Sequence, residues 1–148
     1  MTEDGTPEDL DQIVELYHEA LGAFMRGDHE PAKRLFSERE DVTLGNPFGP
    51  FARGWTQVVQ TMERAAAHYR DGDADGFDTI ARYVGPDLAC TVEVERLRSK
   101  VGGREDLTPL ELRVTTLFRR EDGGWRIVHR HADPITTPQA AESVLRDA

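Results

Sequence analysis

The sequence predicts an α+β fold in which helices pack against one face of an antiparallel sheet. Two observations predict it. Apolar residues recur at helical spacing in the first part of the chain. From residue 76 onward, runs rich in β-branched and aromatic residues are separated by Gly, Pro and Asp. The 148 residues contain no repeat, so we expect a single domain spanning 1–148.

Three helices are expected before the sheet. The first follows Thr6-Pro7, because a hydroxyl cap, a proline and then acidic residues are typical of a helix start. Its apolar stripe includes Tyr17 and Phe24, and it ends at Gly27. The next elements are a short helix after Asp28, a strand over 42–44, a turn over 45–50, and a third helix after Gly54 that carries Trp55, Met62 and Tyr69 on its apolar side.

Four strands follow, over 77–84, 88–97, 110–120 and 125–132. A turn over 101–108, rich in Gly and charged residues, separates the second strand from the third. A tight turn at Asp122-Gly123-Gly124 joins the last two strands, and residues 138–147 are expected to form a terminal helix.

The composition narrows the possible functions. With 28 acidic against 18 basic residues, the net charge is −10, which argues against a nucleic-acid partner. The single Cys90 cannot form an internal disulfide and indicates a reduced thiol. Neither a signal-peptide pattern nor an apolar run of membrane-spanning length is present. We therefore expect a cytoplasmic protein with no membrane partner.

The strongest candidate for chemistry is the His-x-His-x-Asp ending of the last strand. Because strand side chains alternate between faces, His129, His131 and Asp133 are predicted to project to one side. One histidine assisted by Asp133 is a candidate general base, since imidazole titrates near neutrality. Two alternatives stay open: the histidines ligate a metal together with a carboxylate, or they only form hydrogen bonds in the pocket.

Several motifs resemble those of a known family. They are Gly27-Asp28, Asn46-Pro47-Phe48-Gly49, Arg53-Gly54-Trp55, and above all the segment Gly124–His131. Their order resembles the SnoaL-like family, which is related to ketosteroid isomerase and nuclear transport factor two, over about residues 8–135, leaving a tail over 136–148. The Gly-x-Trp-x-x-x-His-x-His ending is also similar to the association domain of calcium/calmodulin-dependent kinase.

The resemblance implies a cone-shaped, cystatin-like fold, in which a curved sheet wraps the long N-terminal helix. It also implies a cavity for a small hydrophobic molecule, no cofactor, and a homodimer paired through the outer sheet face. In the isomerase, an Asp acts as base, while a Tyr and a protonated Asp form the oxyanion hole. Those positions fall here on Asn46, Ala20 and Thr116, so steroid isomerisation by that mechanism is not expected.

The same register predicts which strand residues face the cavity. On one strand, Cys90, Val92 and Val94 are expected to face inward, with Glu93 and Glu95 outward. On the next strand, Val114, Thr116 and Phe118 are expected to face inward. Arg113 is expected to face outward and pair with Glu93 or Glu95. Alternatively, a bulge turns it inward to bind an acidic ligand.

The predicted function is binding of a small molecule in an apolar cavity. The expected ligand contacts are Tyr17, Phe24, Asn46, Trp55, Met62, Val92, Val94, Arg113, Thr116 and Phe118. If the protein is an enzyme, we expect an isomerase, cyclase or hydratase acting on a hydrophobic carbonyl compound. His131 or Asp133 would then be the base, and Tyr17 or Asn46 would polarise the oxygen. The alternatives are a non-catalytic association or sensor domain and a metal-dependent enzyme.

One further motif partly matches a calcium-binding loop. Asp71–Gly76 matches the first half of a calcium-binding loop, but its twelfth position is Arg82 where a bidentate Glu is needed. A solvated turn between the third helix and the sheet is the preferred interpretation.

Overall fold

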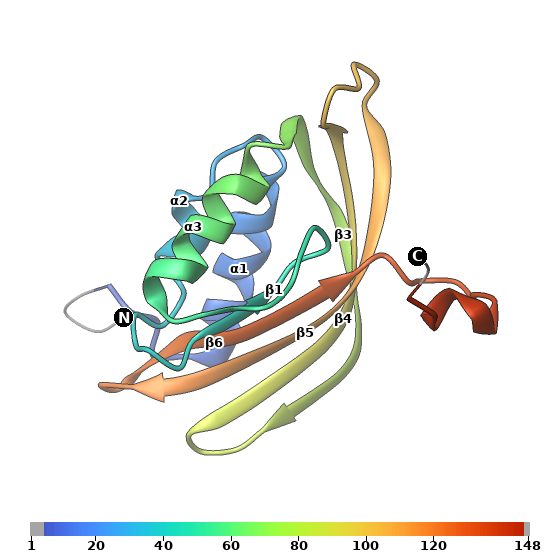
Figure 1. The fold of residues 1–148 in the computed structure, drawn as a ribbon. Coiled ribbons are helices and arrows are strands. Elements are labelled where there is room, and N and C mark those ends of the chain that lie inside the picture. The colour runs from blue at the N-terminus through green and yellow to red at the C-terminus, as the bar shows by residue number, and fades with distance from the viewer. Residues whose placement is uncertain (1–4, 147–148) are drawn as a thin grey trace.

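The computed structural model describes residues 5–146, in which three α-helices cover one face of a curved six-stranded sheet (Figure 1). The helices are α1 (Leu10–Phe24), α2 (Glu30–Lys33) and α3 (Trp55–Ala66). The strands are β1 (Thr43–Gly45), β2 (Ala52–Arg53), β3 (Tyr69–Val84), β4 (Leu88–Val101), β5 (Thr108–Glu121) and β6 (Gly124–Asp133). The predicted α+β fold class is confirmed.

The strands lie in the order β2-β1-β6-β5-β4-β3. All neighbouring pairs are antiparallel except β1 and β6, which run parallel. We call the face covered by the helices the inner face and the opposite face the outer face. Within residues 5–146, none of the helices combines the length and apolar character needed to cross a bilayer.

The first helix begins later than the sequence indicated. Asp9 caps α1, because its side-chain Oδ1 accepts a hydrogen bond from the Asp11 N–H at 2.9 Å. Thr6 and Pro7 stay outside the helix, and the Pro7 carbonyl oxygen accepts a hydrogen bond from the Trp125 N–H. The residues before α1 therefore tie the start of β6 to the helical layer.

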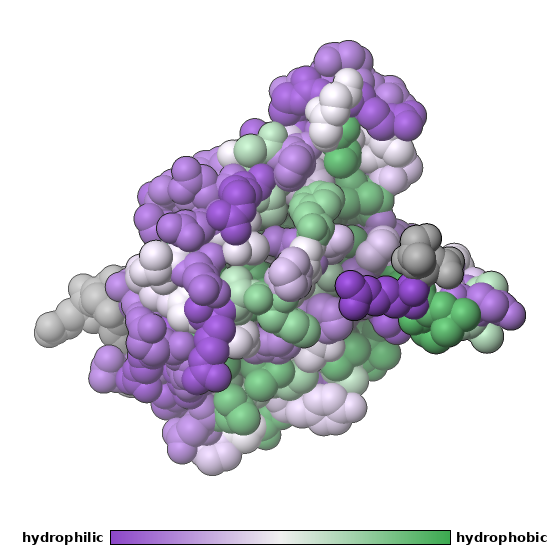
Figure 2. All heavy atoms as spheres, viewed as in Figure 1, coloured by the Kyte–Doolittle hydropathy of each residue, from purple (hydrophilic) through white to green (hydrophobic). Residues whose placement is uncertain are grey.

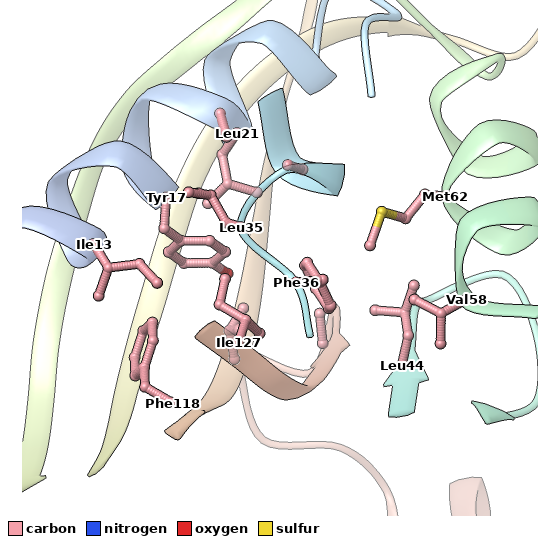
Figure 3. Packing of buried hydrophobic residues seen from close by; sticks show 14 of the residues in the cluster. Ile13, Tyr17, Leu21, Leu35, Phe36, Leu44, Val58, Met62, Phe118 and Ile127 are labelled. Carbon is pink, nitrogen blue, oxygen red and sulfur yellow. The ribbon is translucent and has the colours of Figure 1, made fainter. Parts of the chain in front are cut away.

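The core lies between the helices and the inner face. In Figure 3, Tyr17 projects from α1 toward the strand that carries Ile127, and Met62 of α3 faces Leu44 of β1. Figure 2 shows hydrophobic residues gathered in the gap between the helical layer and the sheet, while the outward sides of the helices are mostly hydrophilic. Burial of these apolar surfaces is the main force that holds the two layers together.

Two predicted elements differ in the structure. Asp71–Gly76 is part of β3, whose pairing with β4 is interrupted between Arg70 and Asp73 and again between Ala74 and Gly76. The sequence of such an irregular strand resembles that of a turn, because its polar residues do not alternate with apolar ones. The terminal helix expected over 138–147 is reduced to a short 3-10 turn at Ala141–Val144, and position 147 lies outside the described residues.

A β-bulge in β6 determines which of its side chains face the helices. Phe118 pairs with Ile127, but the next residue on β5, Leu117, pairs with His129, so Val128 has no partner on β5. The extra residue reverses the alternation, because side chains on a strand change face at every position. Ile127 and Arg130 consequently both point to the inner face.

Candidate ligand-binding site

A cavity of about 40 Å³ lies between α1, α3 and the inner face of the sheet. Most of its wall is apolar and includes Leu21, Phe24, Phe48, Met62, Leu97 and Leu112. The polar side chains on the wall are Tyr17, Asn46, Tyr69 and Arg130. A buried water needs about 10–15 Å³, so the cavity has room for a few water-sized groups or for one small functional group of a ligand.

Three side chains from different elements meet beside this cavity. Tyr17 of α1 donates a hydrogen bond from its hydroxyl to Glu95 Oε2 at 2.5 Å. Arg130 of β6 donates from Nε to the Tyr17 hydroxyl oxygen at 2.7 Å and from Nη2 to Glu95 Oε1 at 2.8 Å. Each pair in this Tyr17–Glu95–Arg130 cluster is therefore hydrogen-bonded, as buried charges require.

Burial and charge both act on this cluster. Burial raises the pKa of Tyr17 well above its ordinary value of 10.0; the Arg130 charge opposes that rise and Glu95 adds to it. Burial lowers the pKa of Arg130, but the Glu95 carboxylate and the Tyr17 hydroxyl outweigh burial and raise it overall. Tyr17 therefore stays a neutral hydroxyl and Arg130 stays a cation throughout the physiological range.

Several hydrogen-bond donors of the cavity-lining residues have no partner within residues 5–146, among them Asn46 Nδ2, Arg130 Nη1 and the Tyr69 hydroxyl. Arg130 makes no hydrogen bond from Nη1 to any residue between 5 and 146, and neither does the Tyr69 hydroxyl. In that part of the chain, no fully buried side-chain nitrogen or oxygen lacks a partner, so both groups keep some accessible surface, and both residues line the cavity. Burial raises the pKa of Tyr69 to about 12, so it remains a donor.

The sequence matches the family model of the SnoaL-like domain over residues 13–136, which is most of the chain. The protein belongs to the SnoaL-like family. A search of curated proteins finds no significant match.

Solved structures share the fold of this SnoaL-like domain at low sequence identity. A Thiobacillus denitrificans protein, provisionally named a calcium/calmodulin-dependent protein kinase type II association domain, is 18% identical with a TM-score of 0.72, covering 88% of this chain and 98% of its own. A protein of the nuclear transport factor 2-like family from Streptomyces avermitilis, provisionally named a dehydratase, is 21% identical with a TM-score of 0.70. The match covers 88% of this chain and 97% of that protein. A ketosteroid isomerase-like protein from Erwinia carotovora is 17% identical with a TM-score of 0.69. The match covers 93% of this chain and 100% of that protein.

The orientation predicted for the β6 histidines is wrong. His129 and His131 lie on the outer face, because the bulge at Val128 reverses the alternation that would have turned them inward. His129 Nδ1 lies 2.8 Å from Thr43 Oγ1, and the Phe51 ring packs on His131 with centroids 5.4 Å apart. In this SnoaL-like domain the two histidines hold β1 and the segment after it, and they do not contact the cavity.

Asp133 and Arg113 also lie on the outer face, where Arg113 Nε donates to Asp133 Oδ1 at 2.7 Å. The outward orientation expected for Arg113 is correct, but its partner is Asp133 rather than Glu93 or Glu95. Asp133 is therefore engaged in an ion pair away from the cavity.

The orientation predicted for the β4 side chains is also wrong. Glu93 and Glu95 point inward and are 3% and 0% exposed, while Cys90, Val92 and Val94 lie on the outer face. Both acids can be buried because each has a partner on α1: Glu95 binds Tyr17, and Glu93 lies 2.9 Å from His18 Nε2. The rule that apolar residues face inward fails where a polar pair bridges two layers.

The predicted ligand contacts divide into three groups, and the first, Val92, Val94 and Arg113, lies on the outer face and does not contact the cavity. Tyr17, Phe24, Asn46 and Met62 line the cavity. Thr116 and Phe118 face inward as expected but are packed in the core, and Trp55 packs against the core from its edge. The polar residues that sequence reasoning missed are Tyr69, Glu95 and Arg130. The sequence shows Arg130 between two histidines on a strand. This pattern predicts an inward-facing Arg130 only if the bulge is foreseen.

The acids of the calcium-like motif take part in ion pairs across the sheet. Lys100 Nζ lies 3.0 Å from Asp71 Oδ2, and Arg98 forms an ion pair with Asp75. Within residues 5–146, no group of three or more His, Cys, Asp and Glu side chains is arranged to hold a metal ion.

Proposed function

We propose that this SnoaL-like domain binds a small molecule with a mainly hydrocarbon body and one acceptor oxygen, as in a ketone. The observation that carries the proposal is Arg130 Nη1, which has no partner within residues 5–146 and belongs to a cation that lines a mainly apolar cavity. A guanidinium in such a place binds an oxygen more strongly than it would in water, because the local dielectric is low.

The neighbours of Arg130 make it a preorganised donor. Tyr17 and Glu95 hold two of its three nitrogens, so the ligand does not have to order the side chain on binding. The carboxylate also balances the guanidinium charge, which favours a neutral acceptor such as a carbonyl oxygen. The free Tyr69 hydroxyl supplies a second donor on the same wall.

We infer binding without turnover. An isomerase, cyclase or hydratase that acts on a carbonyl compound needs a base beside the substrate. No carboxylate is among the described residues that line the cavity, and the two oxygens of Glu95 are directed at Tyr17 and Arg130 rather than at the cavity's contents. His129, His131 and Asp133 lie on the other face of the sheet and cannot supply the base.

The proposal is tested by calorimetric titration with 2-decanone, a molecule with an alkyl chain and one carbonyl oxygen. Tyr69→Phe removes a free donor without breaking a bond of the protein, and we expect it to weaken binding by about five-fold. Arg130→Lys keeps the charge but loses the planar donor set, and we expect a loss of about ten-fold or more.

Each variant has a matched control on the outer face. Tyr83→Phe changes an exposed tyrosine, and Arg113→Lys changes an exposed arginine, so neither alters the cavity. A wild type that does not bind the ketone, or cavity variants that bind it as well as their controls do, would refute the proposal. Turnover of the ketone would contradict the binding-only role.

We also propose that two copies of the chain pair through the outer face. Cys90, Val92 and Val94 form a half-buried apolar row there, and Tyr83 beside them is 63% exposed. Sedimentation should give a dimer for the wild type and a monomer for Val92→Lys. The control Leu107→Lys, in the β4–β5 turn, should remain dimeric. A larger ring would favour the association-domain alternative.

A further inference from the structure

A second hollow lies directly outside the cavity. It is an open groove of about 540 Å³ between α3 and residues 46–52, which are the loop after β1 and the first residue of β2. Asn46, Phe48 and Ala65 line both the groove and the cavity, so the two spaces share a wall. Figure 1 shows the segment after β1 reaching toward the start of β3, where Tyr69 lies.

Phe48 is the most exposed part of the shared wall. Its side chain is 49% exposed, and its ring lies 5.2 Å from the His68 ring and 5.8 Å from the Tyr69 ring. The backbone N–H of Phe48 donates to Asn46 Oδ1 at 2.8 Å, which holds the turn by a local bond only. To join the groove to the cavity, this ring would have to turn away from the His68 and Tyr69 rings.

The ionisable side chains of the groove are basic. Of the described residues that line it, only Arg64 and His68 are ionisable, and no carboxylate is among them, although the chain carries a net charge of −10. Arg64 makes no ion pair within residues 5–146, and its side-chain contact is a long hydrogen bond of 3.4 Å to Thr61 Oγ1. The guanidinium is therefore available to an anion.

From these features we infer that the ligand is a two-ended molecule, with a carbonyl head at Arg130 and an anionic group at the other end, held in the groove by Arg64 and His68. The inference rests on the proposed function for the head and adds the charged tail. A cavity of about 40 Å³ holds the head alone, so the chain must pass Phe48 to reach the groove. A carboxylate and a phosphate ester share the required chemistry.

The test compares ligands with the same head and chain. The neutral ligand is 2-decanone, and the anionic ligands are 9-oxodecanoate and 9-oxodecyl phosphate. In the wild type we expect at least one anion to bind about five-fold more tightly than the ketone, as for a single exposed charge pair, and to lose that advantage at high salt. Whichever anion binds more tightly identifies the source of the negative charge.

Arg64→Gln should abolish the advantage of the anion and leave the affinity for 2-decanone unchanged. The control is Arg53→Gln, which removes an exposed charge of the same sign just before α3 and does not line the groove. If both anions bind no better than the ketone, or if their advantage survives in Arg64→Gln, the inference is wrong while the proposed function stands. If neither the ketone nor the anions bind, the proposed function has failed first.

Discussion

Arg130 and Glu95 lie on strands that are not neighbours, yet their side chains meet across β5 with Nη2 and Oε1 2.8 Å apart. The curvature of the sheet and the hydroxyl of Tyr17 above it bring the two charges together on the inner face. Arg130 is 12% exposed and Glu95 is 0% exposed, so the pair is desolvated and each charge depends on the other.

Breaking this pair should be costly. Glu95→Gln leaves Arg130 buried without a counter-charge, and we expect the free energy of unfolding to fall by about 3 kcal/mol or more. Replacing both residues, as Glu95→Leu with Arg130→Met, should cost less than Glu95→Gln alone, because no isolated charge remains. Urea denaturation followed by circular dichroism measures both values.

The matched control is the exposed ion pair of Arg113 and Asp133. Arg113→Gln removes an interaction in which Arg113 is 57% exposed, so the loss should stay below about 1 kcal/mol. Equal losses for Glu95→Gln and Arg113→Gln would contradict the view that the inner pair is a desolvated unit.

The fold could be predicted from the sequence because its signals are local. The apolar stripe through Ile13, Tyr17 and Leu21 has helical period, and the β-branched runs around Val94 and Val114 have the composition of strands. Patterns of this kind depend on neighbouring residues only, and they survive an error of one or two positions at the ends of an element.

The site could not be predicted because it depends on which face of the sheet each strand side chain occupies. A single unpaired residue, Val128, decides whether Arg130 or its flanking histidines face the helices, and no residue type marks that position as a bulge. Likewise, Glu93 and Glu95 face inward only because His18 and Tyr17 stand opposite them on α1. Such pairings join residues more than seventy positions apart.

The packing of His129 predicts a loss of stability in mild acid. Burial, aided by the nearby His131, lowers the pKa of His129 below its ordinary value of 6.5. The folded protein then binds fewer protons here than the unfolded chain does, so stability is retained above pH 6.5 and is lost as the pH falls below it. The partly exposed ring limits the effect to less than about 1 kcal/mol.

Thermal midpoints measured from pH 7 to pH 5 would show this loss, and His129→Gln should make the decline shallower because glutamine does not titrate. The control His68→Gln changes an exposed histidine and should follow the wild type. An identical decline in all three proteins would assign the acid sensitivity to other groups.

Gly45 sets the position of Phe51, which packs on the outer histidines. A Cβ at position 45 would lie 2.5 Å from Phe51 Cε1, so Gly45→Ala must push the ring aside. We expect the ring protons of His131 to lose the aromatic shift that Phe51 causes, and the same change should appear in Phe51→Ala. Gly49→Ala is the control, because nothing lies within 4 Å of its added Cβ. Proton NMR of the histidine rings that gave the same spectrum for Gly45→Ala and Gly49→Ala would contradict this packing.

Gly72 distinguishes the irregular strand from a calcium-binding loop. A Cβ at position 72 would overlap the backbone oxygen of Arg98 on β4, and backbone cannot move aside as a side chain can. We expect Gly72→Ala to lower the free energy of unfolding by about 3 kcal/mol, as overpacking does in tight interiors. Gly103→Ala, in the open β4–β5 turn, meets nothing within 4 Å and should change the free energy of unfolding by less than about 0.5 kcal/mol.

Calcium should leave the thermal midpoint of the wild type unchanged, because Asp71 and Asp75 are paired with Lys100 and Arg98. A midpoint that rises with calcium, together with a tolerated Gly72→Ala, would restore the loop interpretation.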